Sequence, residues 1–311
     1  MFQELFIKEE NNENKLIPFN EWENLIDNFK KLSKNIEIND ENLAVEILKK
    51  PIENAIKKRI PDKKENKRFG IFFSGGVDST LIAYLCKKFN ADFICYTVGF
   101  KGSKDLQESK KISKYYGFDH KTKELSLEES EKLFKKTAKI LGNELNIVNL
   151  GVGSVELAAI ELAEKDNIDL FFGGLGSEEI FAGYQRHEKA EDINKECWDG
   201  LKTMYERDFK RDFLISKAKN VSFLTPFLDD SLIIEAMKIS GNLKIKDNHK
   251  KYILRKTALS LGLKEDFCFR QKIAAQYGSN FDKAIEKITK KYGFKMKREY
   301  LEYLKKEILF N

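Results

Sequence analysis

The feature that most constrains the fold is a glycine-rich turn between a short apolar run and a helical pattern. Residues 69–73 form a continuous apolar run, the hexapeptide SGGVDS follows at 74–79, and apolar residues then recur at helical spacing as far as Phe89. A short apolar run before a turn is typical of a buried strand, and the later spacing is typical of a helix. The sequence therefore predicts strand, loop and helix in that order.

The same alternation continues along the next hundred residues. Strands are expected at 92–99, 121–125 and 168–172, and helices at 103–116, from Ser126 onward and at 155–164. Ser126 and Glu129 fit a capping box at a helix start. Alternating strands and helices predict an α/β fold, with a parallel sheet of five or so strands and helices on both faces. From about Glu188 onward only amphipathic helices are expected.

Charge and cysteine content restrict the partners and the compartment. A formal net charge of +6, from 56 Lys+Arg against 50 Asp+Glu, is only a weak indication of nucleic acid. The four cysteines are far apart and form no CxxC pair, so neither a disulfide framework nor a zinc site is expected. The compartment expected from this cysteine content is a reducing cytoplasm. No run approaches the roughly 18 to 20 apolar residues that span a bilayer, and no membrane partner is expected.

The hexapeptide at 74–79 can bind phosphate. Backbone N–H groups in a first helical turn have no partner within the helix and point at an anion placed there. Gly75 and Gly76 let the backbone approach phosphate oxygens, while Ser74 and Ser79 add hydroxyl donors. Asp78 suits such a site if Mg²⁺ bridges it to the phosphates. The alternative is a tight strand-to-helix turn that uses glycine for its geometry and aspartate as a cap.

The hexapeptide is not a Walker loop, because no lysine ends it. It resembles the PP-loop, SGGxDS, of the ATP pyrophosphatase superfamily. That resemblance implies an adenine nucleotide alpha hydrolase-like fold, with ATP and Mg²⁺ as ligands. It also implies cleavage between the α and β phosphates, with AMP passed to an acceptor.

Further segments resemble the synthetase domain of asparagine synthetases. After the second strand, Val98 and Gly99 would hold the adenosine moiety and Asp105 would line the site. The segment GGLGSEEIFAGY at 173–184 resembles SGEGxDExFGGY; its Gly174 and Gly176 would contact the nucleotide. Its Glu178 would be a second Mg²⁺ carboxylate opposite Asp78.

Two later segments continue this resemblance. TPFLD at 225–229 is similar to the family's PFLD turn, and YILR at 252–255 precedes RQK at 270–272 in the family's order. Lys272 would be the catalytic cation that neutralises charge at the α phosphate and the pyrophosphate. On this basis the chain divides into a helical extension at 1–68, an ATP-binding core at 69–187 and a helical portion at 188–311 that completes the site. In the extension, helices are expected at 21–32 and 41–60, with Pro51 kinking or dividing the second.

Several positions depart from the family. Leu175 occupies the place of the Glu in SGEGxDE, and leucine can neither ligate metal nor move protons. The family's E-x-R before PFLD is Ser-Phe-Leu at 222–224, so the acceptor pocket should be less polar. No cysteine stands at position 2, and residues 1–68 are too few for a glutaminase domain. The chain is therefore not expected to hydrolyse glutamine by itself.

Three functions remain open. The first is an AMP-forming amide or amine ligase that acts on an unidentified small molecule, with nitrogen from ammonia, an amine or a separate amidotransferase subunit. The second is an enzyme that adenylates a base of tRNA, and the third is a non-catalytic ATP-binding protein. Retained Lys272 argues against the third. His120, His187 and His249 show no metal spacing and are expected to be structural or surface residues.

Overall fold

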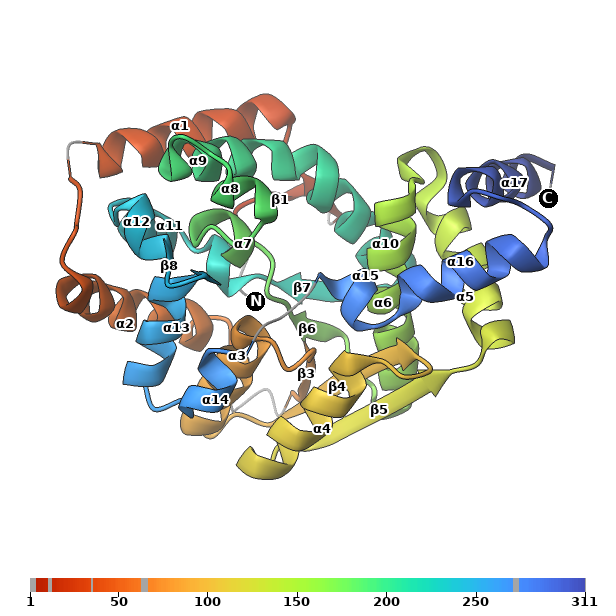
Figure 1. The fold of residues 1–311 in the computed structure, drawn as a ribbon, viewed down its shortest axis with the longest axis horizontal. Helices are drawn as coiled ribbons and strands as arrows, with labels where there is room; N and C mark the ends of the chain where they lie inside the picture. The colour runs from red at the N-terminus through yellow and green to blue at the C-terminus, as the bar shows by residue number, and fades with distance from the viewer. Residues whose placement is uncertain (1–3, 11–12, 35, 63–66, 271–273, 311) are drawn as a thin grey trace.

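The computed structural model describes residues 4–10, 13–34, 36–62, 67–270 and 274–310, and it contains a five-stranded parallel sheet. Its strands run in the order β5-β4-β3-β6-β7 across the sheet (Figure 1). They are β3 (Phe69–Phe72), β4 (Phe93–Phe100), β5 (His120–Leu125), β6 (Leu170–Phe172) and β7 (Ser222–Leu224). The predicted α/β fold with a five-stranded parallel sheet is confirmed.

Alternate residues of the strands face two separate hydrophobic cores. Ile71 of β3 packs into one core, whereas Tyr96 of β4 and Phe171 of β6 pack into the other. Because successive strand side chains point to opposite faces, a sheet covered on both sides must be apolar throughout. The apolar runs seen in the sequence are therefore strands of this sheet, which is covered on both sides.

Helices cover both faces (Figure 1). Those that contribute to the first core are α1 (Phe19–Ser33), α2 (Glu41–Lys57), α3 (Val77–Lys88), α4 (Lys104–Tyr116), α7 (Ser177–Ile180), α9 (Ile193–Met204), α11 (Asp230–Met237), α12 (Gly241–Lys244), α13 (Tyr252–Ser260) and α14 (Glu265–Cys268). Those that contribute to the second core are α5 (Leu127–Leu141), α6 (Ile147–Ala163), α10 (Lys210–Lys219), α16 (Phe281–Lys291) and α17 (Lys297–Phe310). Two short helices, α8 (Gln185–Glu188) and α15 (Ala275–Gly278), lie between longer elements.

The expectation that strands end at about Glu188 is wrong. β7 pairs in parallel with β6 and forms an edge of the sheet. It has only three residues, too few for a periodic pattern to show in the sequence. Two hairpins were also not expected, β1 (Ile7–Glu10) with β2 (Glu13–Leu16), and β8 (Ile245–Lys246) with β9 (His249–Lys250).

Helix α2 is not divided at Pro51, although division was one of the two outcomes expected there. The helix runs from Glu41 to Lys57 with the proline inside it. Proline removes one backbone hydrogen bond, but Leu48, Ile52 and Ile56 keep a buried face on either side of it. Tertiary packing supplies most of the stability of such a helix.

The N-terminal residues are joined to the turn after β7 by a buried ionic network. Arg59 donates to Glu4 at 2.8 Å and to Asp229 at 2.9 Å. Glu4 in turn accepts hydrogen bonds from the backbone and hydroxyl of Thr225. The network connects the first helices with the segment TPFLD. The boundaries at 68 and 187 stay predictions.

Two global properties of the described residues complete the fold. None of their helices is both long and apolar enough to cross a membrane. All four cysteines are buried free thiols.

Candidate nucleotide and acceptor site

The site lies where the order of the strands reverses. From β3 the chain proceeds outward to β4 and β5, then crosses back to β6 and β7 on the other side. In open α/β sheets, ligands bind beyond the carboxyl ends of the strands at this switch point. A cavity of about 330 Å³ opens there, lined by residues that follow β3, β4 and β6.

The predicted phosphate loop stands at one end of this cavity. Ser74, Asp78 and Ser79 line it, and α3 begins directly after the loop. Gly75 has φ +68°, and a Cβ there would lie 3.1 Å from a methyl carbon of Ile112. Glycine is therefore required for the loop's shape. The Ser74 and Ser79 hydroxyls lie 3.4 Å apart, within hydrogen-bond distance of one another.

The two predicted metal carboxylates meet at one cation, which the sequence analysis missed. Lys251 Nζ lies 2.8 Å from Asp78 Oδ2 and 2.8 Å from Glu178 Oε1, and it donates to Ser177 Oγ at 3.0 Å. Lys251 is buried. Burial lowers its pKa, but the two carboxylates outweigh burial and the pKa is raised overall. Its position directly before the YILR segment is the signal that could have found it.

The point between the Asp78 and Glu178 carboxylates suits a cation, and two carboxylates are ligands that fit Mg²⁺. Both oxygens are within contact distance of one point, which Lys251 Nζ now occupies. Among the described residues, no group of three or more His, Cys, Asp or Glu could hold a metal. Mg²⁺ commonly uses one or two carboxylates and completes its coordination with water and substrate phosphates. Asp78 and Glu178 would hold it in that way.

Glycines keep the segment after β6 close to this cluster. A Cβ on Gly183 would lie 1.6 Å from Glu178 Oε2, and one on Gly174 would lie 3.1 Å from Asp78 Cβ. Gly174 lines the cavity. Gly176 has φ +94°, and a Cβ there would meet Leu228 of the TPFLD turn at 2.5 Å. Glycine is therefore required at position 176 by its backbone conformation and by the packing of Leu228. The contact of Gly176 with the nucleotide stays a prediction.

The end of the cavity where the nucleoside is predicted to bind is formed where β4 meets α15. Val98 and Asp105 line the cavity there. A Cβ on Gly99 would lie 2.6 Å from Ser103 Oγ, and one on Gly278 would lie 2.4 Å from Asp105 Oδ2. The missing side chain of Gly278 lets α15 lie against the start of α4, and Ser103 Oγ donates to the Gly278 carbonyl at 2.9 Å.

Lys272, the predicted catalytic cation, lies outside the described residues. The nearest described residues before and after it, Arg270 and Ala274, reach the site. Arg270 donates to the backbone carbonyls of Gly75 at 3.1 Å and Ser74 at 3.3 Å, and Ala274 lines the cavity. The role of Lys272 stays a prediction.

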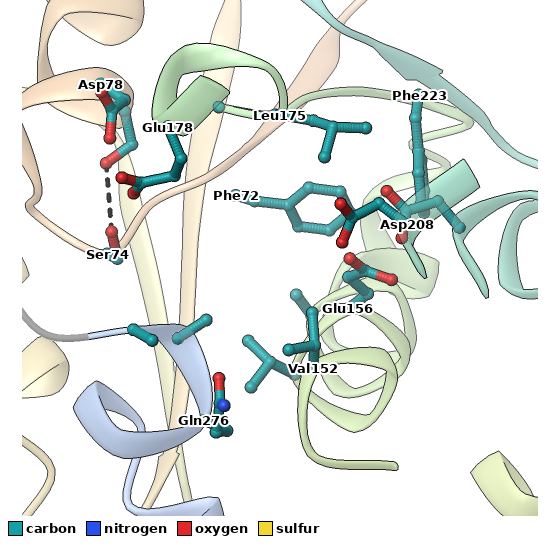
Figure 2. Close-up of a pocket in the computed structure, with 18 of the residues that line it drawn as sticks. Phe72, Ser74, Asp78, Val152, Glu156, Leu175, Glu178, Asp208, Phe223 and Gln276 are labelled. Carbon is teal, nitrogen blue, oxygen red and sulfur yellow. Dashed lines mark hydrogen bonds between the residues drawn. The ribbon is translucent and has the colours of Figure 1, made fainter. Parts of the chain in front are cut away.

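The opposite end of the cavity is walled by apolar side chains. Leu175, Phe72, Phe223 and Val152 line it and point toward a common space (Figure 2). The rings of Phe72 and Phe223 pack edge to face with centroids 5.2 Å apart. Leu175 and the Ser-Phe-Leu segment were expected to make this end less polar, and both contribute apolar side chains to it.

Beside this wall lies a buried charged cluster that the sequence analysis missed. Asp208 lies in a π-helix, Tyr205–Phe209, which leads into α10, and it accepts from Arg207 at 2.7 Å and from Arg211 at 3.1 Å. Arg211 also donates to Asp212 at 2.7 Å. Such π-helical turns are frequent at functional sites. The charges belong to a segment without any recognisable motif, so only the fold could bring them to the cavity.

Two further carboxyl groups complete the cluster. Glu156 of α6 lies 3.7 Å from Arg211 Nη2, and Glu179 of α7 is paired with Arg207. Burial, together with the charge of Asp212, raises the pKa of Glu156 well above its usual range. Burial also raises the pKa of Glu179 to about 7 and that of Asp212 to about 6. In this cluster the four carboxyl groups of Glu156, Glu179, Asp208 and Asp212 share the guanidinium groups of Arg207 and Arg211.

The fold and the site together define an α/β protein with a PP-loop between the central strand and its helix. The chain matches the family model described as asparagine synthase over residues 48–193 and 185–310. It belongs to the asparagine synthase family.

The curated relatives are longer than this chain. It is 32% identical over 326 aligned residues to a putative glutamine-hydrolysing asparagine synthetase of Methanocaldococcus jannaschii, which covers 92% of the chain and 59% of that protein. It is 26% identical to the glutamine-hydrolysing asparagine synthetase of Homo sapiens, over 90% of the chain and 49% of that protein. The chain thus spans about half the length of these two relatives.

Similar solved structures include an NH3-dependent NAD synthetase from Campylobacter jejuni. It shares 16% sequence identity with the chain at a TM-score of 0.38, covering 88% of this chain and 95% of the other. An NMN synthetase from Francisella tularensis shares 15% identity at a TM-score of 0.33, with 78% and 93% coverage.

Proposed function

We propose that the protein is an ATP-dependent ligase that transfers AMP to a small-molecule acid and releases pyrophosphate, before a nitrogen nucleophile displaces the AMP. One observation carries the proposal. Asp78 and Glu178, from two separate strand-to-helix turns, converge on Lys251 beside the phosphate loop. Membership of the asparagine synthase family supports the same chemistry.

In the proposed reaction a carboxylate oxygen of the acid attacks the α phosphorus of ATP. The bond from this phosphorus to the oxygen that bridges to the β phosphorus breaks, and its electron pair leaves with pyrophosphate. Backbone N–H groups of the 74–76 loop and the Ser74 and Ser79 hydroxyls would hold the leaving group. Lys272, as predicted, would balance its charge. Mg²⁺, when bound, would neutralise phosphate charge.

The nucleoside would lie against the end of β4. Val98, Gly99 and Asp105 would contact it there, with Gly174 and, as predicted, Gly176 on the facing turn. The carboxylate of the acid would then reach the α phosphate from the Leu175 end of the cavity. We do not assign aspartate as the acid, because Leu175 and Phe223 place apolar side chains at this end of the cavity. We do not assign glutamine hydrolysis to these residues either.

ATP–pyrophosphate exchange with Mg²⁺ tests the proposal. The assay would use a panel of carboxylic acids that includes aspartate, with bulk tRNA assayed for AMP release in parallel. We expect exchange that depends on one acid and is lost in Asp78→Ala and Lys272→Ala but kept in Asp266→Ala, which removes an exposed carboxylate. AMP release with tRNA alone would favour the RNA-modifying alternative. ATP binding without turnover would favour the non-catalytic one.

A further inference from the structure

One face of α6 lines the cavity with apolar side chains. The four residues of this face recur at intervals of four, three and four positions, and they are Val148, Val152, Val155 and Ala159. Residues at this spacing lie on one side of a helix. Val148 is 46% exposed, whereas Ala159, three turns further along, is 2% exposed. The α6 face therefore leads from the surface of the protein into the cavity.

The wall opposite the α6 face is aromatic and is held in place by ring packing. The Phe72 ring stacks on Phe171 with centroids 4.9 Å apart and packs edge to face on Phe223. In Figure 2, Phe72 and Leu175 lie between Glu178 on one side and the acceptor-end carboxyl groups on the other. A ligand that extends from the phosphate loop toward the acceptor end must therefore pass along apolar side chains.

The charged groups beyond this wall are paired with one another. Asp208 accepts from Arg207 and Arg211, and Arg211 also donates to Asp212. Glu156 shares a side-chain hydrogen bond with Asp212, which requires a proton on one of the two carboxyl groups. Burial raises the pKa of Glu156 well above its usual range, so Glu156 holds this proton. The two ionised aspartates then balance the two guanidinium groups.

The third guanidinium at this end, Arg186, also has partners within the protein. Its Nε pairs with Glu196 at 2.7 Å, and its guanidinium carbon lies 4.3 Å from the centroid of the Tyr184 ring. Its Nη2 lies against α9, because a Cβ on Gly200 would be 3.1 Å from it. The charge of Arg186 is therefore already balanced, and the acceptor end requires no charge from a ligand.

We infer that the acid activated here is a monocarboxylic acid with an uncharged, apolar body, which packs between the α6 face and the wall of Phe72, Phe223 and Leu175. The inference rests on the proposed function, since the carboxylate must meet the α phosphate beside the phosphate loop. A second charge on the body would lose its hydration against these side chains and find no partner that is free to replace it.

A series of acids matched in length tests this inference. Butanoate, hexanoate and octanoate are compared with the dicarboxylates and ω-amino acids of the same length, and with aspartate, in ATP–pyrophosphate exchange and by calorimetric binding. Each methylene buried contributes about 0.8 kcal/mol, or roughly fourfold in affinity. We expect the affinity for the alkanoates to rise by about this factor per methylene until the space is filled. The best alkanoate should be preferred by about tenfold or more over its charged counterparts.

Variants on both sides of the cavity locate the preference. Leu175→Asn keeps the side chain close to its original size and places an amide in the wall, and it should raise the KM for the best alkanoate roughly tenfold. Val152→Thr keeps the shape of the α6 face and adds a hydroxyl, and it should raise the same KM several-fold. Leu32→Asn makes the first change at an exposed leucine, and Val221→Thr makes the second at a valine that packs against the second core. Neither control should alter the preference.

Failure of this inference and failure of the proposed function give different results. Exchange that is best with aspartate or a dicarboxylate, or an alkanoate preference that survives both Leu175→Asn and Val152→Thr, overturns the inference and leaves the adenylation proposal standing. Calorimetric binding of alkanoates that strengthens with chain length and is weakened by Leu175→Asn, without exchange, supports the inference and overturns the adenylation proposal. If Leu175→Asn fails to fold, Val152→Thr and the wild-type series still decide.

Discussion

At the Lys251 ammonium, one positive charge balances two carboxylates that come from different turns. Lys251→Met would leave Asp78 and Glu178 facing one another without a cation. Removing one partner of a buried ionic group costs about 3–5 kcal/mol, and we expect a loss of stability of that order without metal. Addition of Mg²⁺ should therefore raise the melting temperature of this variant by more than it raises that of the wild type.

Thermal unfolding with Mg²⁺ and with a chelator measures this effect. Lys250→Met is the matched control, because Lys250 is the adjacent residue and forms a more exposed pair with Glu188. It should unfold like the wild type under both conditions. An Mg²⁺ response of Lys251→Met no larger than that of the wild type would contradict the assignment of this position as a shared cation site.

At the scale of single elements, the position of α15 depends on the close approach of Gly278 to Asp105. A side chain on Gly278 would press against Asp105, which lines the predicted nucleoside end of the cavity. Gly278→Ala should therefore shift α15 and raise the KM for ATP on the order of tenfold, since small displacements at an active site have large effects. The KM measured in the exchange assay checks this.

A glycine on α6 provides the comparison for Gly278. In Gly153→Ala the new Cβ would meet no neighbour closer than 3.4 Å, so the KM for ATP should not change. If Gly278→Ala and Gly153→Ala have the same KM, α15 does not position Asp105.

Elements with strong local patterns could be predicted from the sequence, and the others could not. β3 and β4 are continuous apolar runs, and Ser126 with Glu129 forms the predicted capping box. β7 was missed because three residues show no periodicity and the strand exists only by pairing with β6. The same reason explains the missed part of the site. Glu156 and Asp208 lie 52 positions apart in the sequence, and only the packing of α10 on α6 brings both to the cavity.

For the whole molecule, the Arg59 network fixes the N-terminal helices to the turn after β7. Arg59→Met would leave Glu4 and Asp229 buried without their shared guanidinium. We expect a loss of about 3–5 kcal/mol in the free energy of unfolding, measured by denaturant titration. Arg68→Met removes an exposed arginine that pairs with Asp92 and Asp119, and should cost less than about 1 kcal/mol. Equal losses in both variants would show that the buried network is not what holds these helices.

The reversal of strand order at β3 also has a consequence for how the protein is made. A ribosome releases β3, β4 and β5, on one side of the sheet, before β6 and β7 on the other. Lys251, which joins the turns after β3 and β6, leaves the ribosome later than all five strands. A nascent chain therefore lacks the cation between Asp78 and Glu178 until all five strands have been synthesised. A ligand that needs Lys251 can therefore stabilise only the finished fold and cannot guide its early assembly.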